Sequence, residues 1–168
     1  MVSFRKSKNN QLNSVLVSVT GESCDDEAVQ LAYKLLDHQN GQLYIVYVIE
    51  VERSLPVDAE ISAATAKAEQ VLKRAEEISK SFHGKIHAEM LQSRKAGPAL
   101  VHEAVDRMVD AMIISVPYSE QYGSFRMGET ASYVLEHSPC KVILWREPIS
   151  TKQLSGQSET ENSETILK

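Results

Sequence analysis

The segment that decides the fold is residues 111–145, which read AMIISVPYSEQYGSFRMGETASYVLEHSPCKVILW. Its first part, Ala111–Val116, predicts a buried strand, and a short helix opens at Gly128 after a loop rich in Tyr, Ser and Gly. A loop that leads from a strand into a helix is the commonest place for an α/β fold to hold a small anion. The last strand, Lys141–Trp145, precedes a polar tail and is expected to form a sheet edge. A candidate site and a candidate interface therefore lie in one segment.

Length, charge and cysteine content narrow the class of protein. A chain of 168 residues is long enough for one domain with a real core. The net charge of −5 argues against nucleic-acid binding, and no apolar run reaches the roughly 18 residues of a membrane-spanning helix. The first residues lack the apolar stretch of a secretory signal. Cys24 and Cys140 form no disulfide framework, so a reducing cytoplasm is expected.

Strands and helices alternate outward from this segment. Runs of apolar and β-branched residues predict strands over Ser14–Val19, Gln42–Val51, Lys85–Leu91, Ala111–Val116 and Lys141–Trp145. Apolar residues at helical spacing predict one helix capped by Ser23, a second over 58–82, and a third from Gly97. This alternation predicts a flavodoxin-like α/β fold, a five-stranded parallel sheet in order 3-2-1-4-5 with helices on both faces.

The predicted topology also locates a crevice and the domain limits. The strand order reverses between the first and fourth strands, which end near Thr20 and Ser115. Residues 1–12 are expected to form a flexible arm, residues 13–147 the domain, and residues 148–168 a disordered polar tail.

Five short motifs, in this order, carry a resemblance to a known family. They are VLVSVTG at 15–21, GPA at 97–99, VDAMII at 109–114, and GETASYVL at 128–135 followed by SPCKV at 138–142. From about Ser14 to Arg146 the chain resembles the universal stress proteins. The resemblance implies the adenine nucleotide alpha hydrolase-like fold. It also implies small, cytoplasmic, usually dimeric proteins of stress survival, some of which bind ATP.

The sequence departs from the ATP-binding pattern of that family, which is G-x-x-G, nine residues, then G-[ST]. Counting back from Gly128 places Ser115 and Tyr118 at the two earlier glycines, and Glu129 replaces the final Ser or Thr. Thr20 stands where the ATP binders carry an aspartate. Because glycines let backbone N–H groups approach phosphates, Tyr118 is expected to block that approach. Glu129 is expected to compete with a phosphate for a helix N-terminus.

The candidate residues around this crevice are therefore interpreted as a degenerate nucleotide site. They are Thr20, Val48, Ser115, Gly123, Arg126, Gly128, Glu129 and Thr130. The expected cofactor is none, and the alternative is ATP or another adenine nucleotide with Mg. Glu129 has the simpler interpretation of a favourable first-turn acid. Tyr118, Tyr122 and Phe125 are expected to pack the loop onto the domain or a partner subunit, and the alternative is a lid or a ligand-stacking surface. The histidines lack the spacing of metal ligands.

The apolar edge strand predicts a homodimer. Val142, Ile143, Leu144 and Trp145 would leave an apolar edge exposed to aggregation if the strand had no neighbour. Pairing with the same strand of a second copy across a two-fold axis removes that edge. The family resemblance implies the same dimer.

Three functions remain as hypotheses. The first is a non-enzymatic, dimeric stress-response protein that acts through protein contacts. The second is an adenine-nucleotide sensor of the same fold. The third is a soluble regulatory partner of a membrane transporter. The sequence contains no arrangement of nucleophile, base and orienting residue, so no enzyme is predicted, with slow ATP hydrolysis left open.

Overall fold

The computed structural model describes residues 12–37, 39–118, 120–121 and 124–148. The helices are α1 (Asp25–Leu35), α2 (Ser62–Ser79), α3 (Ala96–Asp106) and α4 (Glu129–His137). The strands are β1 (Ser14–Val19), β2 (Gln42–Glu50), β3 (Lys85–Ser93), β4 (Ala111–Val116), β5 (Glu120–Gln121), β6 (Ser124–Phe125) and β7 (Lys141–Arg146).

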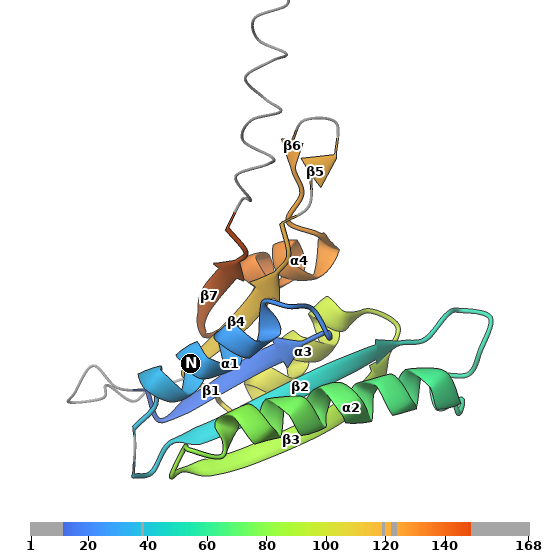
Figure 1. Ribbon diagram of the computed structural model, residues 1–168. Helices are drawn as coiled ribbons and strands as arrows, with labels where there is room; N and C mark the ends of the chain where they lie inside the picture. The colour runs from blue at the N-terminus through green and yellow to red at the C-terminus, as the bar shows by residue number, and fades with distance from the viewer. Residues whose placement is uncertain (1–11, 38, 119, 122–123, 149–168) are drawn as a thin grey trace, which may run out of the picture.

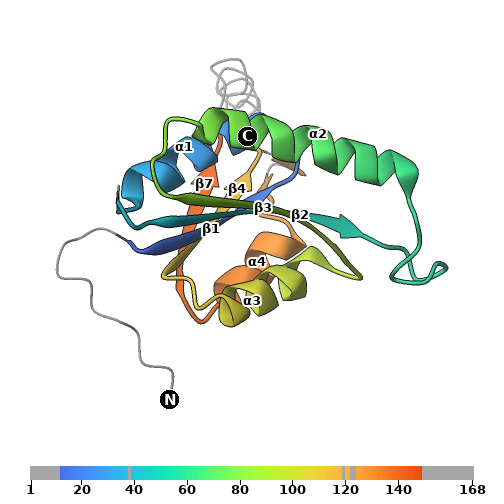
Figure 2. The same cartoon turned by 90° about the horizontal axis from the view of Figure 1, so that it is seen from below.

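A five-stranded sheet forms the centre of the molecule, in the order β3-β2-β1-β4-β7. Every pair of neighbouring strands in it is parallel. Helices α1 and α2 cover one face of the sheet, and α3 and α4 cover the other (Figure 1, Figure 2). The predicted order 3-2-1-4-5 and the α/β class are confirmed.

The central strands are apolar along their length because both of their faces are covered. Every residue of β4 is buried, and so are all but the first residue of β1. Val17 and Ile113 pack with α1 and α2, whereas Leu16 and Met112 pack with α3 and α4. Because β1 and β4 are parallel neighbours, their carboxyl ends lie together, and these ends carry the candidate site.

Strand β7 is a sheet edge, as predicted. Its apolar side chains are half-buried: Ile143 and Trp145 pack toward the layer of α1 and α2, and Val142 and Leu144 toward the other. The indole Nε1–H of Trp145 donates a hydrogen bond to a carboxylate oxygen of Glu27 at 3.1 Å. The side chains of β7 are thus held by their own domain.

Some boundaries differ from those predicted. Helix α2 is shorter than residues 58–82, and β3 continues to Ser93. The antiparallel pair β5 and β6 was not predicted, because strands of two residues are too short to show a periodic pattern. Leu12, placed in the predicted arm, forms an isolated β-bridge with Leu36. Residues 1–11 of that arm and 149–168 of the predicted tail lie outside the described residues.

Candidate functional site

A cavity of about 340 Å³ lies where β1 and β4 end and α4 begins. The predicted site residues that line it are Thr20, Val48, Ser115, Arg126, Gly128, Glu129 and Thr130. Gly123, the remaining predicted residue, lies outside the described part of the chain. Ala96, Pro117 and Met127 also line the cavity and were missed. Ala96 begins α3, and no local pattern connects that helix to this cavity.

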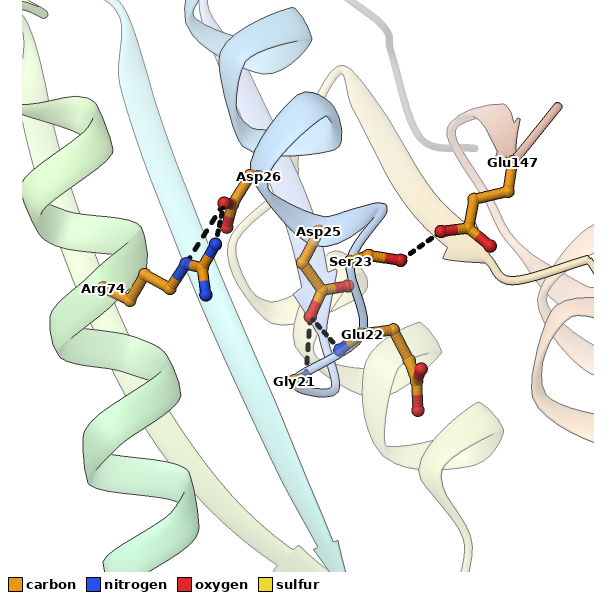
Figure 3. A network of polar contacts seen from close by, with 7 residues as sticks. All are labelled: Gly21, Glu22, Ser23, Asp25, Asp26, Arg74 and Glu147. Atoms are coloured by element: carbon orange, nitrogen blue, oxygen red, sulfur yellow. Dashed lines mark hydrogen bonds and ion pairs between the residues drawn. The ribbon is translucent and has the colours of Figure 1, made fainter.

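The carboxylate of Asp25 holds the turn between β1 and α1. Its Oδ2 atom accepts hydrogen bonds from the backbone N–H groups of Thr20 and Gly21, each at 2.7 Å, and of Glu22 at 3.2 Å. Its Oδ1 atom accepts a hydrogen bond from the hydroxyl of Ser115 on β4. Figure 3 shows this carboxylate pointing back toward the turn. Asp25 is only 5% exposed, so these groups satisfy one another away from water.

The predicted capping role of Ser23 is wrong. Helix α1 begins one residue later than such a cap requires, with Cys24 at the N-cap and no side-chain cap bond. The Ser23 hydroxyl instead donates a hydrogen bond to the carboxylate of Glu147, just after β7 (Figure 3). Asp25, in the first turn of α1, accepts hydrogen bonds from the backbone N–H groups of Thr20 and Gly21 in the loop before the helix. The turn is therefore tied to both β4 and the end of β7.

Gly21 makes this turn possible. Its φ of +94° lies in the left-handed region that side-chain-bearing residues rarely adopt. A Cβ atom at this position would lie 3.1 Å from Cγ2 of Val71 on α2. Glycine therefore allows both the backbone path to Asp25 and the close approach of α2.

Carboxylates of the chain lie at the starts of both helices beside the cavity. At α4, Gly128 forms the N-cap with φ +85°, and Glu129 follows it and contacts Nζ of Lys95 at 2.9 Å. The hydrogen bond and charge of Lys95 lower the pKa of Glu129, while Glu129 and then Glu50 raise the pKa of Lys95. At α3, the N–H of Ala96 donates to the Glu50 carboxylate at 2.7 Å. The N-terminus of a helix favours negative charge, and here the carboxylates of Glu129 and Glu50 provide that charge.

The Tyr118 side chain packs against Phe125 and Arg146. It is not among the described residues that line the wall. Its ring stacks on that of Phe125 with a centroid separation of 5.8 Å. The Arg146 guanidinium lies 5.4 Å from the Tyr118 centroid and 5.6 Å from that of Phe125. These contacts pack the β5–β6 hairpin against the end of β7, whereas Tyr122 lies outside the described residues.

A larger groove of about 520 Å³ lies between α1 and α2. Its lining includes the cations Lys67, Lys73 and Arg74 and the carboxylates Glu22, Asp26 and Glu77. Arg74 pairs with Asp26 across it and so joins the two helices (Figure 3). The strand-end cavity is the stronger candidate for a ligand, because it lies at the carboxyl ends of β1 and β4, where the strand order reverses.

Other reactive side chains contribute little to a site. Burial raises the pKa of the thiols of Cys24 and Cys140, which makes both weak nucleophiles. Within the described ranges, no group of three or more His, Cys, Asp or Glu side chains is placed to hold a metal ion. None of the helices in the same ranges is both long and apolar enough to cross a membrane.

Comparison with known proteins decides the family. Residues 12–146 match the model of the universal stress protein family. The chain belongs to this family. A universal stress protein of Methanocaldococcus jannaschii is 20% identical over 152 residues, which cover 87% of this chain and 89% of the relative.

Solved structures of universal stress proteins share the fold. One from Archaeoglobus fulgidus in complex with dAMP is 16% identical, with a TM-score of 0.62 over 78% of this chain and 95% of that one. Another, in complex with cAMP, is 16% identical, with a TM-score of 0.63 over 82% of this chain and 99% of the other. In the present universal stress protein, Ser115 stands at a glycine position of the ATP-binding pattern, and its hydroxyl is bound to Asp25.

Replacing Asp25 by Ala is expected to lower the free energy of unfolding by about 2–4 kcal/mol, because hydrogen bonds to a buried charged group are lost. Urea denaturation measures the change. Asp26→Ala is the matched control, since it removes the neighbouring carboxylate and only a surface ion pair with Arg74. Equal losses for the two variants would contradict the assigned role of Asp25.

Proposed function

We propose that this universal stress protein is a non-enzymatic, dimeric stress-response regulator whose cavity does not hold ATP in the manner of its ATP-binding relatives. It acts through contacts with proteins, either a second copy or a regulatory target such as a membrane transporter. A cytoplasmic location fits the free cysteines Cys24 and Cys140. The observation that carries the proposal is the bonding of the Asp25 carboxylate to the turn beside the cavity.

That bonding occupies the N–H groups of the turn after β1, of whose residues Thr20 lines the cavity. Backbone N–H groups in a tight turn bind anions well when they point at a free site. Here the N–H groups of Thr20, Gly21 and Glu22 point at Asp25. At the opposite wall, Glu129 adds a further negative charge. A triphosphate at the start of α4 would approach the Glu129 carboxylate at the position where the family pattern offers a hydroxyl.

The polar groups at the cavity also lack the arrangement of a hydrolase. The Ser115 hydroxyl donates to Asp25, whose other carboxylate oxygen accepts backbone N–H groups, so this carboxylate is held by the turn. Among the described residues that line the cavity, there is no His or Cys. A regulatory role therefore fits these residues better than catalysis.

A second candidate function is that of an adenine-nucleotide sensor. The cavity of about 340 Å³ is retained in the fold, at the lower end of the usual size of ligand pockets. Related structures are described in complex with cAMP and with dAMP. A nucleotide with fewer phosphates than ATP requires fewer donors, so a sensor of this kind would use altered contacts.

Nucleotide content distinguishes the two functions. Purified protein is denatured with acid, and the supernatant is analysed for adenine nucleotides. The apo protein is then titrated calorimetrically with ATP and magnesium. The proposal predicts no stoichiometric nucleotide and no saturation at millimolar ATP. Stoichiometric adenine nucleotide in the extract, or saturable ATP binding at micromolar concentration, would favour the sensor and contradict the regulator.

The proposed dimer uses the outer edge of β7. Backbone N–H groups of Lys141 and Glu147 donate to Asp110 and Val116, toward β4. Because alternate residues of a strand point to opposite sides, the even-numbered Leu144 directs its N–H away from β4. An antiparallel partner strand would bond to this outward row.

Leu144→Pro is therefore expected to convert the dimer to a monomer without unfolding it. Proline removes an outward N–H group and is tolerated on an edge strand when that group does not face its neighbour. Leu144→Ala is the control, because it shortens the same side chain but keeps the N–H group. Light scattering gives the mass and circular dichroism the fold. A Leu144→Pro dimer, or a wild-type monomer, would rule out this edge as the interface.

A further inference from the structure

The ion pair between Lys95 and Glu129 joins the starts of α3 and α4 at the cavity. Lys95 is the N-cap residue of α3, and Glu129 is the first residue of α4. Their charged atoms are 2.9 Å apart, and Glu129 lines the cavity together with Ala96, the neighbour of Lys95. The positive charge nearest to Glu129 is thus already paired within the protein.

The rest of the cavity offers little that would hold an anion. Arg126 is the cation among the described lining residues, and its side chain lies at an exposed position, as do those of Lys95 and Glu129. The Glu50 carboxylate accepts the first N–H of α3. The Ser115 hydroxyl points to Asp25. A phosphate entering the cavity would meet the Glu129 carboxylate at the start of α4. Lys95 could pair with the phosphate only after leaving Glu129.

The same walls suit an uncharged molecule. Val48, Ala96, Val116 and Met127 present apolar surface, and the hydroxyl-bearing Thr20 and Thr130 lie among them. Ligand pockets combine a mostly apolar wall with a few polar groups that fix orientation. Moving an uncharged molecule from water to such walls costs less free energy than moving a phosphorylated one.

We propose that the Lys95–Glu129 ion pair makes this cavity selective for uncharged ligands of nucleoside size over their phosphorylated counterparts. The inference rests on the proposed function, in which the cavity does not hold ATP in the family manner, and it adds the class of ligand and the residues that set it. Glu129 repels a phosphate directly. It also engages Lys95, the cation that would otherwise compensate the charge.

Adenosine and AMP are suitable probes because they differ by one phosphate group. Equilibrium dialysis with each gives the affinities of the wild type and of Glu129→Gln, which keeps the size of the side chain and removes its charge. Wild type is expected to bind adenosine more tightly than AMP. Glu129→Gln is expected to tighten AMP binding by about tenfold and to change adenosine binding much less, because one repulsive charge is lost and Lys95 is released.

Two further variants test the mechanism. Glu136→Gln removes an equally charged, exposed residue from a later turn of the same helix and is expected to change neither affinity. The double variant Lys95→Met with Glu129→Gln is expected to lose most of the gain in AMP affinity. Tighter binding of AMP than adenosine by wild type, binding of neither probe, or an equal gain from Glu136→Gln would each overturn the inference.

These experiments distinguish failure of the inference about the ion pair from failure of the proposed function. If wild type binds ATP with magnesium at micromolar concentration, the proposed function fails. If wild type does not bind ATP and Glu129→Gln fails to improve AMP binding, the proposed function stands, and the selectivity assigned to the ion pair is rejected.

Discussion

The buried carboxylate of Asp25 is the interaction on which the strand-end region depends. It holds the turn after β1 through backbone N–H groups and fastens that turn to Ser115 of β4, the neighbouring strand at which the strand order reverses. A buried charge is stable only when its hydrogen bonds are satisfied, so the turn, helix α1 and β4 must keep their relative positions. The backbone N–H groups and the Ser115 hydroxyl that meet this requirement are therefore not free to bind a ligand.

The cavity beside this turn keeps the shape of a ligand site while its chemistry differs from the family pattern. Its walls come from the ends of β1 and β4 and from the starts of α3 and α4, as the sheet topology dictates. Carboxylates of Asp25, Glu50 and Glu129 occupy positions near helix starts that favour anions. An internal anion at such a position stabilises the fold and competes with an external one.

The sequence predicts the sheet well and its long-range polar contacts poorly. Continuous apolar runs such as Ala111–Val116 identify buried parallel strands, and their order then locates the crevice at Thr20 and Ser115. The bond from Ser115 to Asp25 joins residues 90 positions apart, and that from Lys95 to Glu129 joins residues 34 apart, so no local pattern contains either. The direction of the Tyr118 ring likewise depends on a hairpin that the sequence did not predict.

The central claim is that the turn after β1 stays bound to Asp25 and does not engage phosphate. Titrating the isotope-labelled protein with ATP and magnesium, while following backbone amide resonances by NMR, tests it most directly. The account predicts that the Thr20, Gly21 and Glu22 amide resonances remain unchanged at millimolar ATP. A saturable shift of the Gly21 amide resonance would show that the turn releases Asp25 for a phosphate, and would contradict the account.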